Sequence, residues 1–93
     1  MSAAGPGPVA AAIEADLRRQ LQPDSIELHD DGHLHVGHAG AREGGHFSVR
    51  IVAGCFAGRS RVMRHRLVYD ALGSLAARGI HALAIEALAP GEG

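Results

Sequence analysis

The 93-residue sequence has one cysteine, no tryptophan and only three aromatic residues. Because Cys55 is alone, the chain cannot form an internal disulfide or an all-thiolate metal site, and we expect a reducing, cytoplasmic location. No stretch approaches the roughly 20 consecutive apolar residues of a membrane-spanning helix. The opening MSAAGPGP also lacks the basic segment and apolar run of a secretory signal. We therefore expect no membrane partner.

The chain also has little net charge, with nine basic and ten acidic residues giving a formal charge of −1. This balance argues against a general polyanion binder, whose affinity comes from contacts with phosphates. Histidine is abundant by contrast, with seven residues in the chain. Since an unperturbed imidazole has a pKa of about 6.5, the charge of the protein depends on pH in the physiological range.

Hydrophobic residues make up 46% of the sequence, enough for one folded domain with an aliphatic core. We expect Phe47, Phe56 and Tyr69 to join the isoleucines, leucines and valines of that core. The small Gly- and Pro-rich segment 1–8 is predicted to be disordered, the domain to span 9–90, and a short tail to follow at 91–93.

Two segments have the apolar periodicity of amphipathic helices. The first spans 9–22, with Pro8 suited to its opening position and Pro23 ending it. The second spans 61–78, and Gly79 is well placed as its C-terminal cap.

Three segments alternate or are rich in Ile and Leu, as strands are. They are 25–30, 46–54 and 80–88; in the middle one Phe47, Val49 and Ile51 face one way. Residues 33–36 also alternate, but this periodicity does not decide whether they form a small hairpin with the first strand. The order α-β-β-α-β implies an antiparallel first pair of strands and, through a right-handed crossover, a parallel second pair. We predict an α+β two-layer sandwich in which helices cover one face of a three-stranded mixed sheet.

Three pieces of the sequence together resemble the BolA family: HFSVRIV, FAGRSRVMRHRLVYDAL and GIHALAIEALAP. The second contains the family's F-x-G followed by R-H-R-L-V, and the third contains its I-H-A-L-A-I at residues 80–85. They occur in the family order, and the resemblance covers nearly the whole of 9–90. It implies a fold similar to a type II KH domain, which agrees with the order of elements predicted above.

The resemblance also implies a function. BolA proteins bind monothiol glutaredoxins, share a [2Fe-2S] cluster with them in a heterodimer, and act in cluster trafficking and iron homeostasis. The glutaredoxin supplies its cysteine and a bound glutathione. The BolA side offers the histidine of I-H-A-L-A-I, here His81, and a His or Cys from the loop between the first two strands. The isolated protein is then expected to hold no cofactor and to be a monomer or a weak dimer.

The glycine-rich segment 32–47 contains four histidines, one of which would be that loop ligand. His38, in GHAGA, matches the family position best, and His35 is the alternative because the loop differs in length among members. His33 lies early and His46 lies at the start of the strand, so both are less favoured. Two neutral imidazoles cannot complete a cluster site, which makes a partner a chemical requirement.

Structural readings compete with these roles. His81 would share a strand face with Leu83 and Ile85, as a half-buried structural histidine does. The loop histidines could be solvated side chains that bind zinc or nickel adventitiously. Cys55 is read as an incidental thiol, because the family motif places no ligand there and isolated thiols are usually buried.

The segment RSRVMRHR is basic, and it suits phosphate, an acidic partner, a fold-stabilising network or plain solvation. Its candidate residues are Arg59, Arg61, Arg64, His65 and Arg66. A transcriptional regulator that binds DNA is the alternative function. Against it, GRSR at 58–61 lacks the second glycine of the KH G-x-x-G loop, and aromatic residues for base stacking are nearly absent. An enzyme is not expected, because no nucleophile motif, phosphate loop or carboxylate pair is recognisable.

Overall fold

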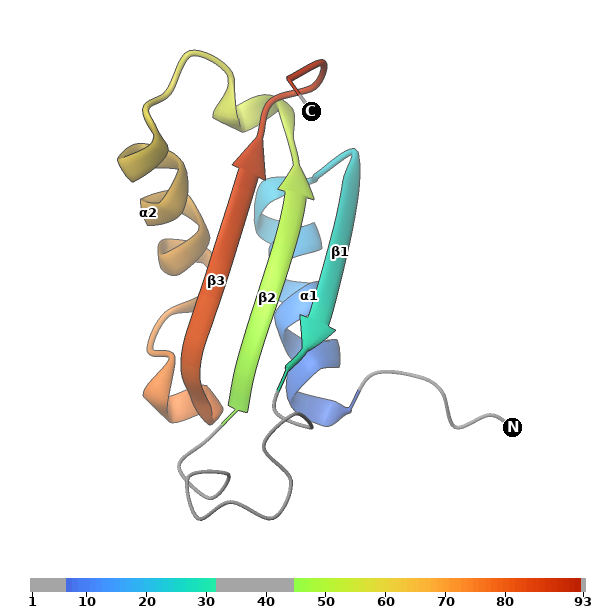
Figure 1. Ribbon diagram of the computed structural model, residues 1–93, viewed down its shortest axis with the longest axis vertical. Helices are drawn as coiled ribbons and strands as arrows, with labels where there is room; N and C mark the ends of the chain where they lie inside the picture. Colours follow the sequence, from blue (N-terminus) through green and yellow to red (C-terminus); the bar gives the residue numbers. More distant parts are fainter. Residues whose placement is uncertain (1–6, 32–44, 93) are drawn as a thin grey trace, which may run out of the picture.

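The computed structural model describes residues 7–31 and 45–92 of the chain. A three-stranded sheet lies against two α-helices, and two short 3-10 turns complete the described elements (Figure 1). The elements in chain order are α1 (Pro8–Leu21), β1 (Ser25–Asp30), β2 (Gly45–Val52), η3 (Gly54–Phe56), α2 (Arg61–Leu72), η4 (Ala76–Arg78) and β3 (Ile80–Leu88). The predicted α+β architecture and order of elements are confirmed.

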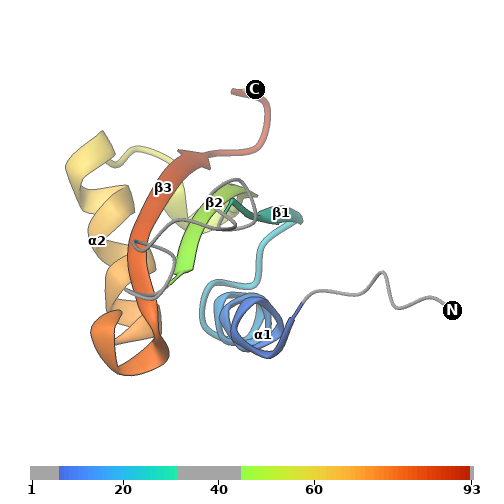
Figure 2. The same ribbon diagram turned by 60° about the horizontal axis from the view of Figure 1, so that its bottom comes forward.

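The sheet has the strand order β1-β2-β3. β1 pairs with β2 antiparallel, and β2 pairs with β3 parallel, as the crossover argument predicted. Seen from its end, the sheet has α1 and α2 packed on one side only (Figure 2). β3 is therefore an edge strand, with α2 beside it. Within the described ranges, no helix has the length and apolar composition needed to cross a membrane.

The core lies between the sheet and the helices. Phe47, Val49 and Ile51 alternate along β2 and are at most 5% exposed, so they face the helices as predicted. From α1, Ile13 and Leu17 are fully buried against them. Burial of a side chain of this size contributes about 1.5–3 kcal/mol, so these contacts hold the two layers together.

One residue of the predicted core lies outside it. Phe56 is fully buried, but Tyr69 is 40% exposed on α2. The buried α2 side chains are Val68 and Leu72, and Leu67 and Ala71 pack partly buried against the core. Tyr69 follows Val68 directly, and a step of one residue turns a helix by more than a quarter of a turn, which carries Tyr69 away from the sheet.

The second helix is shorter than predicted. α2 ends at Leu72 instead of continuing to residue 78, because Gly73 takes a positive φ of 72° and donates its N–H to the Tyr69 carbonyl at 2.9 Å. The chain then turns through η4, which is capped by Gly79 with φ of 82°. The apolar stripe continues at Leu75, which packs against the core from this turn. Periodicity alone therefore did not reveal the break.

An ion pair fixes the segment that leads into β3. Arg78, in η4, pairs with Asp16 on α1, and its Nε donates to the Leu72 carbonyl at 2.5 Å. The Arg78 guanidinium, and after it Arg19, lower the pKa of the Asp16 carboxyl below its ordinary value. α1, the end of α2 and η4 are thus tied together just before His81.

Candidate histidine site

Two histidines meet where the parallel strands β2 and β3 begin. The ring centroids of His46 and His81 are 5.0 Å apart, and the ring planes are inclined at 38°. Because parallel strands start at the same end of a sheet, residues near their N-termini become neighbours across the ladder. His46 was a less favoured candidate for the second ligand. It is nevertheless the histidine that the described structure brings to His81.

A β-bulge turns His81 outward. Gly45 pairs with Ile80 while His46 pairs with Ala82, so His81 is an extra residue on β3. Ile80 is buried and Leu83 half-buried, whereas His81 is exposed. The expectation that His81 shares a face with Leu83 and Ile85 is wrong, because simple alternation does not anticipate the bulge. The reading of His81 as a half-buried structural histidine does not fit this exposure.

The backbone on both sides of His46 is held in place. The His46 carbonyl accepts a hydrogen bond from the Asp31 N–H at 2.7 Å, and the Gly45 N–H donates to the Gly79 carbonyl at 2.8 Å. The Phe47 ring lies so close over Gly45 that a Cβ at that position would collide with it. The two histidines therefore lie on strand ends whose backbone is fixed, and a fixed backbone keeps the distance between two side chains constant.

The favoured loop ligands, His38 and His35, lie outside the described residues, as do His33 and the hairpin considered at 33–36. The segment 32–44 departs after Asp31 and returns at Gly45. Both of these flanking residues bond to the backbone around His46 and β3. Residues 7–31 and 45–92 contain no cluster of three or more His, Cys, Asp or Glu side chains that could hold a metal ion. A complete ligand set therefore needs groups beyond this part of the chain.

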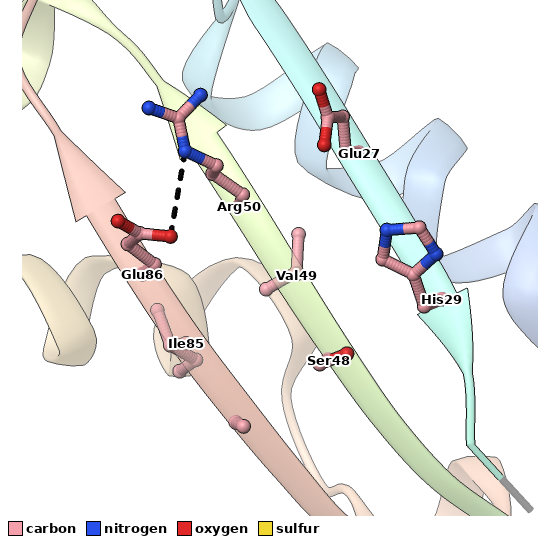
Figure 3. Close-up of a pocket in the computed structure, with 8 residues that line it drawn as sticks. Glu27, His29, Ser48, Val49, Arg50, Ile85 and Glu86 are labelled. Carbon is pink, nitrogen blue, oxygen red and sulfur yellow. Dashed lines mark ion pairs between the residues drawn. The ribbon is translucent and has the colours of Figure 1, made fainter. Parts of the chain in front are cut away.

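The uncovered face of the sheet carries a row of alternating charges (Figure 3). Glu27, Arg50 and Glu86 occupy matching positions on the three strands, and Arg50 Nε lies 3.4 Å from Glu86 Oε1. Exposed pairs of this kind contribute little to stability. His29 lies opposite Ser48 in the same shallow, solvent-open depression. An arginine between two carboxylates does not resemble the carboxylate pair of an acid–base catalyst.

Among the basic residues of 59–66, Arg64 belongs to a fold-stabilising network. Its side chain is only 13% exposed, and it donates to the Ala87 carbonyl of β3 at 3.1 Å and the Arg59 carbonyl at 2.9 Å. It also binds both carboxylate oxygens of Glu92, at 2.5 and 2.9 Å. Arg64 thus takes part in a network that stabilises the fold, whereas Arg61 and Arg66 are exposed. A role of these basic residues in a partner surface stays a prediction.

The Arg64–Glu92 pair predicts a pH effect on stability. Arg64, and then the Ala89 N–H, lower the pKa of Glu92 from 4.5 to about 2. The ionised carboxylate therefore stabilises the fold fully above pH 4.5, and this contribution disappears as the pH falls toward 2. In urea unfolding, the difference in free energy of unfolding between wild type and Glu92→Gln should narrow over that range. Glu27→Gln, on the open sheet face, is the control, and a gap independent of pH would contradict the prediction.

Cys55 is exposed, unlike the buried thiol that isolated cysteines usually provide. Its Sγ lies 4.0 Å from the Leu21 carbonyl, a weak contact. It follows the C-terminal end of β2, at the opposite end of that strand from His46. Cys55 is thus not a neighbour of the histidine pair.

Comparison with known proteins identifies the relatives of this chain. A model of the BolA-like protein family matches residues 17–92. Mouse BolA-like protein 1 is 43% identical over 89 residues, which cover 96% of this chain and 64% of the relative. SufE-like protein 1 of Arabidopsis thaliana is 41% identical, over 86% of this chain and 23% of that protein.

Solved structures agree with the fold. The BolA domain of SufE1 from Arabidopsis thaliana superposes with a TM-score of 0.81 at 40% identity, over 96% of this chain and all of that domain. The solution structure of mouse BolA1 gives a TM-score of 0.77 at 43% identity, covering 97% of this chain and 72% of the mouse chain. The two matches cover 96% and 97% of this chain, so the chain shares the fold of these proteins.

Proposed function

The chain belongs to the BolA-like family, and on that basis we propose that it is an adaptor that forms a heterodimer with a monothiol glutaredoxin and shares a [2Fe-2S] cluster with it. The observation that carries the proposal is the placement of the His46 and His81 rings 5.0 Å apart at one end of the sheet. His81 is exposed and His46 is half-buried beside it. Such an imidazole pair on fixed strand ends supports the proposal, because it offers two ligand nitrogen atoms at one place.

The chemistry of the pair suits such a cluster. In Rieske centres two histidines replace two cysteines on one iron and raise its potential. In our proposal His81 is one ligand of the shared cluster, and the second is His46 or one of the loop histidines, His38 or His35. The cysteine of glutaredoxin and the thiol of its bound glutathione complete the set. The cluster is cargo, which the adaptor holds only in the complex.

This arrangement favours transfer over permanent storage. A neutral imidazole ligand competes with protons near neutral pH, so histidine ligation is weaker in mildly acidic conditions than thiolate ligation by a low-pKa cysteine. We propose a role in iron–sulfur cluster trafficking and iron homeostasis in the cytoplasm, without catalysis by the chain itself.

The test is a titration of the protein into a glutathione-loaded [2Fe-2S] monothiol glutaredoxin, followed by visible absorption and circular dichroism. A new cluster spectrum that saturates at one-to-one stoichiometry is expected. A parallel titration with Zn²⁺ and Ni²⁺ in the absence of glutaredoxin measures adventitious binding by the histidines. An unchanged cluster spectrum would refute cluster sharing.

A further inference from the structure

A second candidate site lies at the opposite end of β3 from the histidine pair. A groove runs between the start of α2 and the last residues of β3. These two segments lie at the upper end of the sheet in Figure 1. It is lined by Arg59, Arg61, Arg64, His65, Ile85, Glu86, Ala87 and Leu88. At about 3.3 Å per residue, six residues of strand separate Ala87 from His81 by about 20 Å. The arginine end of the groove is therefore well separated from the histidine pair.

One wall of the groove is the outer edge of β3. The Leu88 carbonyl points toward β2, where it accepts the Ala53 N–H at 2.9 Å, whereas the Ala87 carbonyl points the other way, to Arg64. Because peptide groups alternate in direction along a strand, those of Leu83 and Ile85 point outward with Ala87. In the described parts of the chain no strand pairs with this edge. Arg64 already occupies the Ala87 carbonyl, so strand addition would use the peptide groups of Leu83 and Ile85.

The other wall is cationic and already binds a carboxylate. The four side chains on this wall are three arginines and a histidine. Arg64 holds the Glu92 carboxylate through two hydrogen bonds. Glu92 lies in the turn after β3, where the Ala89 N–H also donates to its carboxylate at 2.9 Å. The planar guanidinium matches a carboxylate in this two-pronged geometry. Glu92 is not among the groove-lining residues, but its pairing shows that Arg64, which does line the groove, takes a carboxylate partner.

We propose that the groove binds an acidic, extended segment of a partner protein, which pairs with the edge of β3 and displaces Glu92 from Arg64. Strand addition supplies main-chain hydrogen bonds, and alternate acidic side chains of the segment meet the arginines. A nucleic acid fits less well, because the groove lining has no Phe, Tyr or Trp side chain on which a base could stack. The proposal does not depend on the cluster-sharing function.

The experiment is fluorescence anisotropy of a labelled Glu-Val-Glu-Val-Glu-Val-Glu peptide with the metal-free full chain. Glu92→Gln removes the internal competitor and should tighten binding by at least about twofold, whereas Arg61→Glu should weaken it by about threefold or more. Arg61 is exposed and lies outside the hydrogen bonds that Arg64 makes, so its replacement leaves the Arg64 network intact. Amide shifts of Leu83 and Ile85 in NMR spectra should move on peptide addition.

Three matched probes make the proposal refutable. The same peptide with Gln for Glu, and one with alternate amides methylated, should both bind more weakly, whereas His81→Ala should leave peptide binding unchanged. Equal binding of the methylated peptide would overturn strand addition. Absence of binding to both wild type and Glu92→Gln up to about 1 mM would overturn the site, as would tighter binding of a short duplex DNA with the same Arg61 dependence.

Discussion

His81→Ala is expected to abolish the change in the cluster spectrum when the protein is titrated into glutathione-loaded [2Fe-2S] glutaredoxin. The bulge at His81, opposite Gly45 and His46, turns the His81 imidazole out of the sheet and beside His46, and alanine offers no donor atom there. Loss of residues in the outer shell of a metal site already costs about 10–100-fold in affinity, so loss of a direct ligand should cost at least that much. Visible circular dichroism measures the effect.

The matched control is His29→Ala. His29 is exposed on β1 opposite Ser48, on the same uncovered face of the sheet, but it is not stacked against His81. Its removal should leave the spectrum as in the wild type. A wild-type spectrum for His81→Ala would refute the ligand role of His81.

A second set of variants names the other ligand. If His46→Ala removes the new spectrum while His38→Ala and His35→Ala retain it, the pair seen in the structure is the ligand pair. If His46→Ala retains it and one loop variant loses it, His46 is a neighbour and the loop supplies the ligand.

Phe56→Ala is expected to lower the free energy of unfolding by about 3–5 kcal/mol, the cost of removing a large aromatic side chain from a close-packed core. Phe56 is fully buried, and it reaches the core because η3 turns the chain directly after β2. Gly58 then takes a φ of 73°, which leads toward α2. Since a domain is stable by only about 5–15 kcal/mol, this loss should bring the variant close to unfolding at room temperature.

Urea unfolding followed by circular dichroism measures this effect. The control is Val62→Ala, because Val62 is 67% exposed on α2 and its truncation should change stability by no more than about 0.5 kcal/mol. A loss below about 1 kcal/mol for Phe56→Ala would contradict the core position of the ring, since even the smaller Ile→Val truncations cost about that much.

The order of the elements and the directions of the strands could be predicted from the sequence because they depend on local or nearly local rules. Alternation along β2 identifies Phe47, Val49 and Ile51 as inward-facing, and the handedness of a crossover makes β2 and β3 parallel. The family motif I-H-A-L-A-I by itself singles out His81. The roles of glutaredoxin, DNA, His38 and His35 stay predictions.

Other features were decided only by the tertiary structure. The exposure of Tyr69 depends on which side of α2 meets the sheet. The pairing of His46 with His81 depends on a register shift between strands that are joined by 27 residues of chain (Val52 to Ile80), which no local periodicity encodes.

The Arg64–Glu92 pair is a similar case, because it joins residues 28 positions apart. Its formation requires that the start of α2 and the tail after β3 arrive at the same corner of the sheet. The sequence by itself therefore determined the elements, their order and the candidate ligand His81. Packing and register decided which side chains meet, because contacts between distant residues arise only when the sheet and helices are assembled.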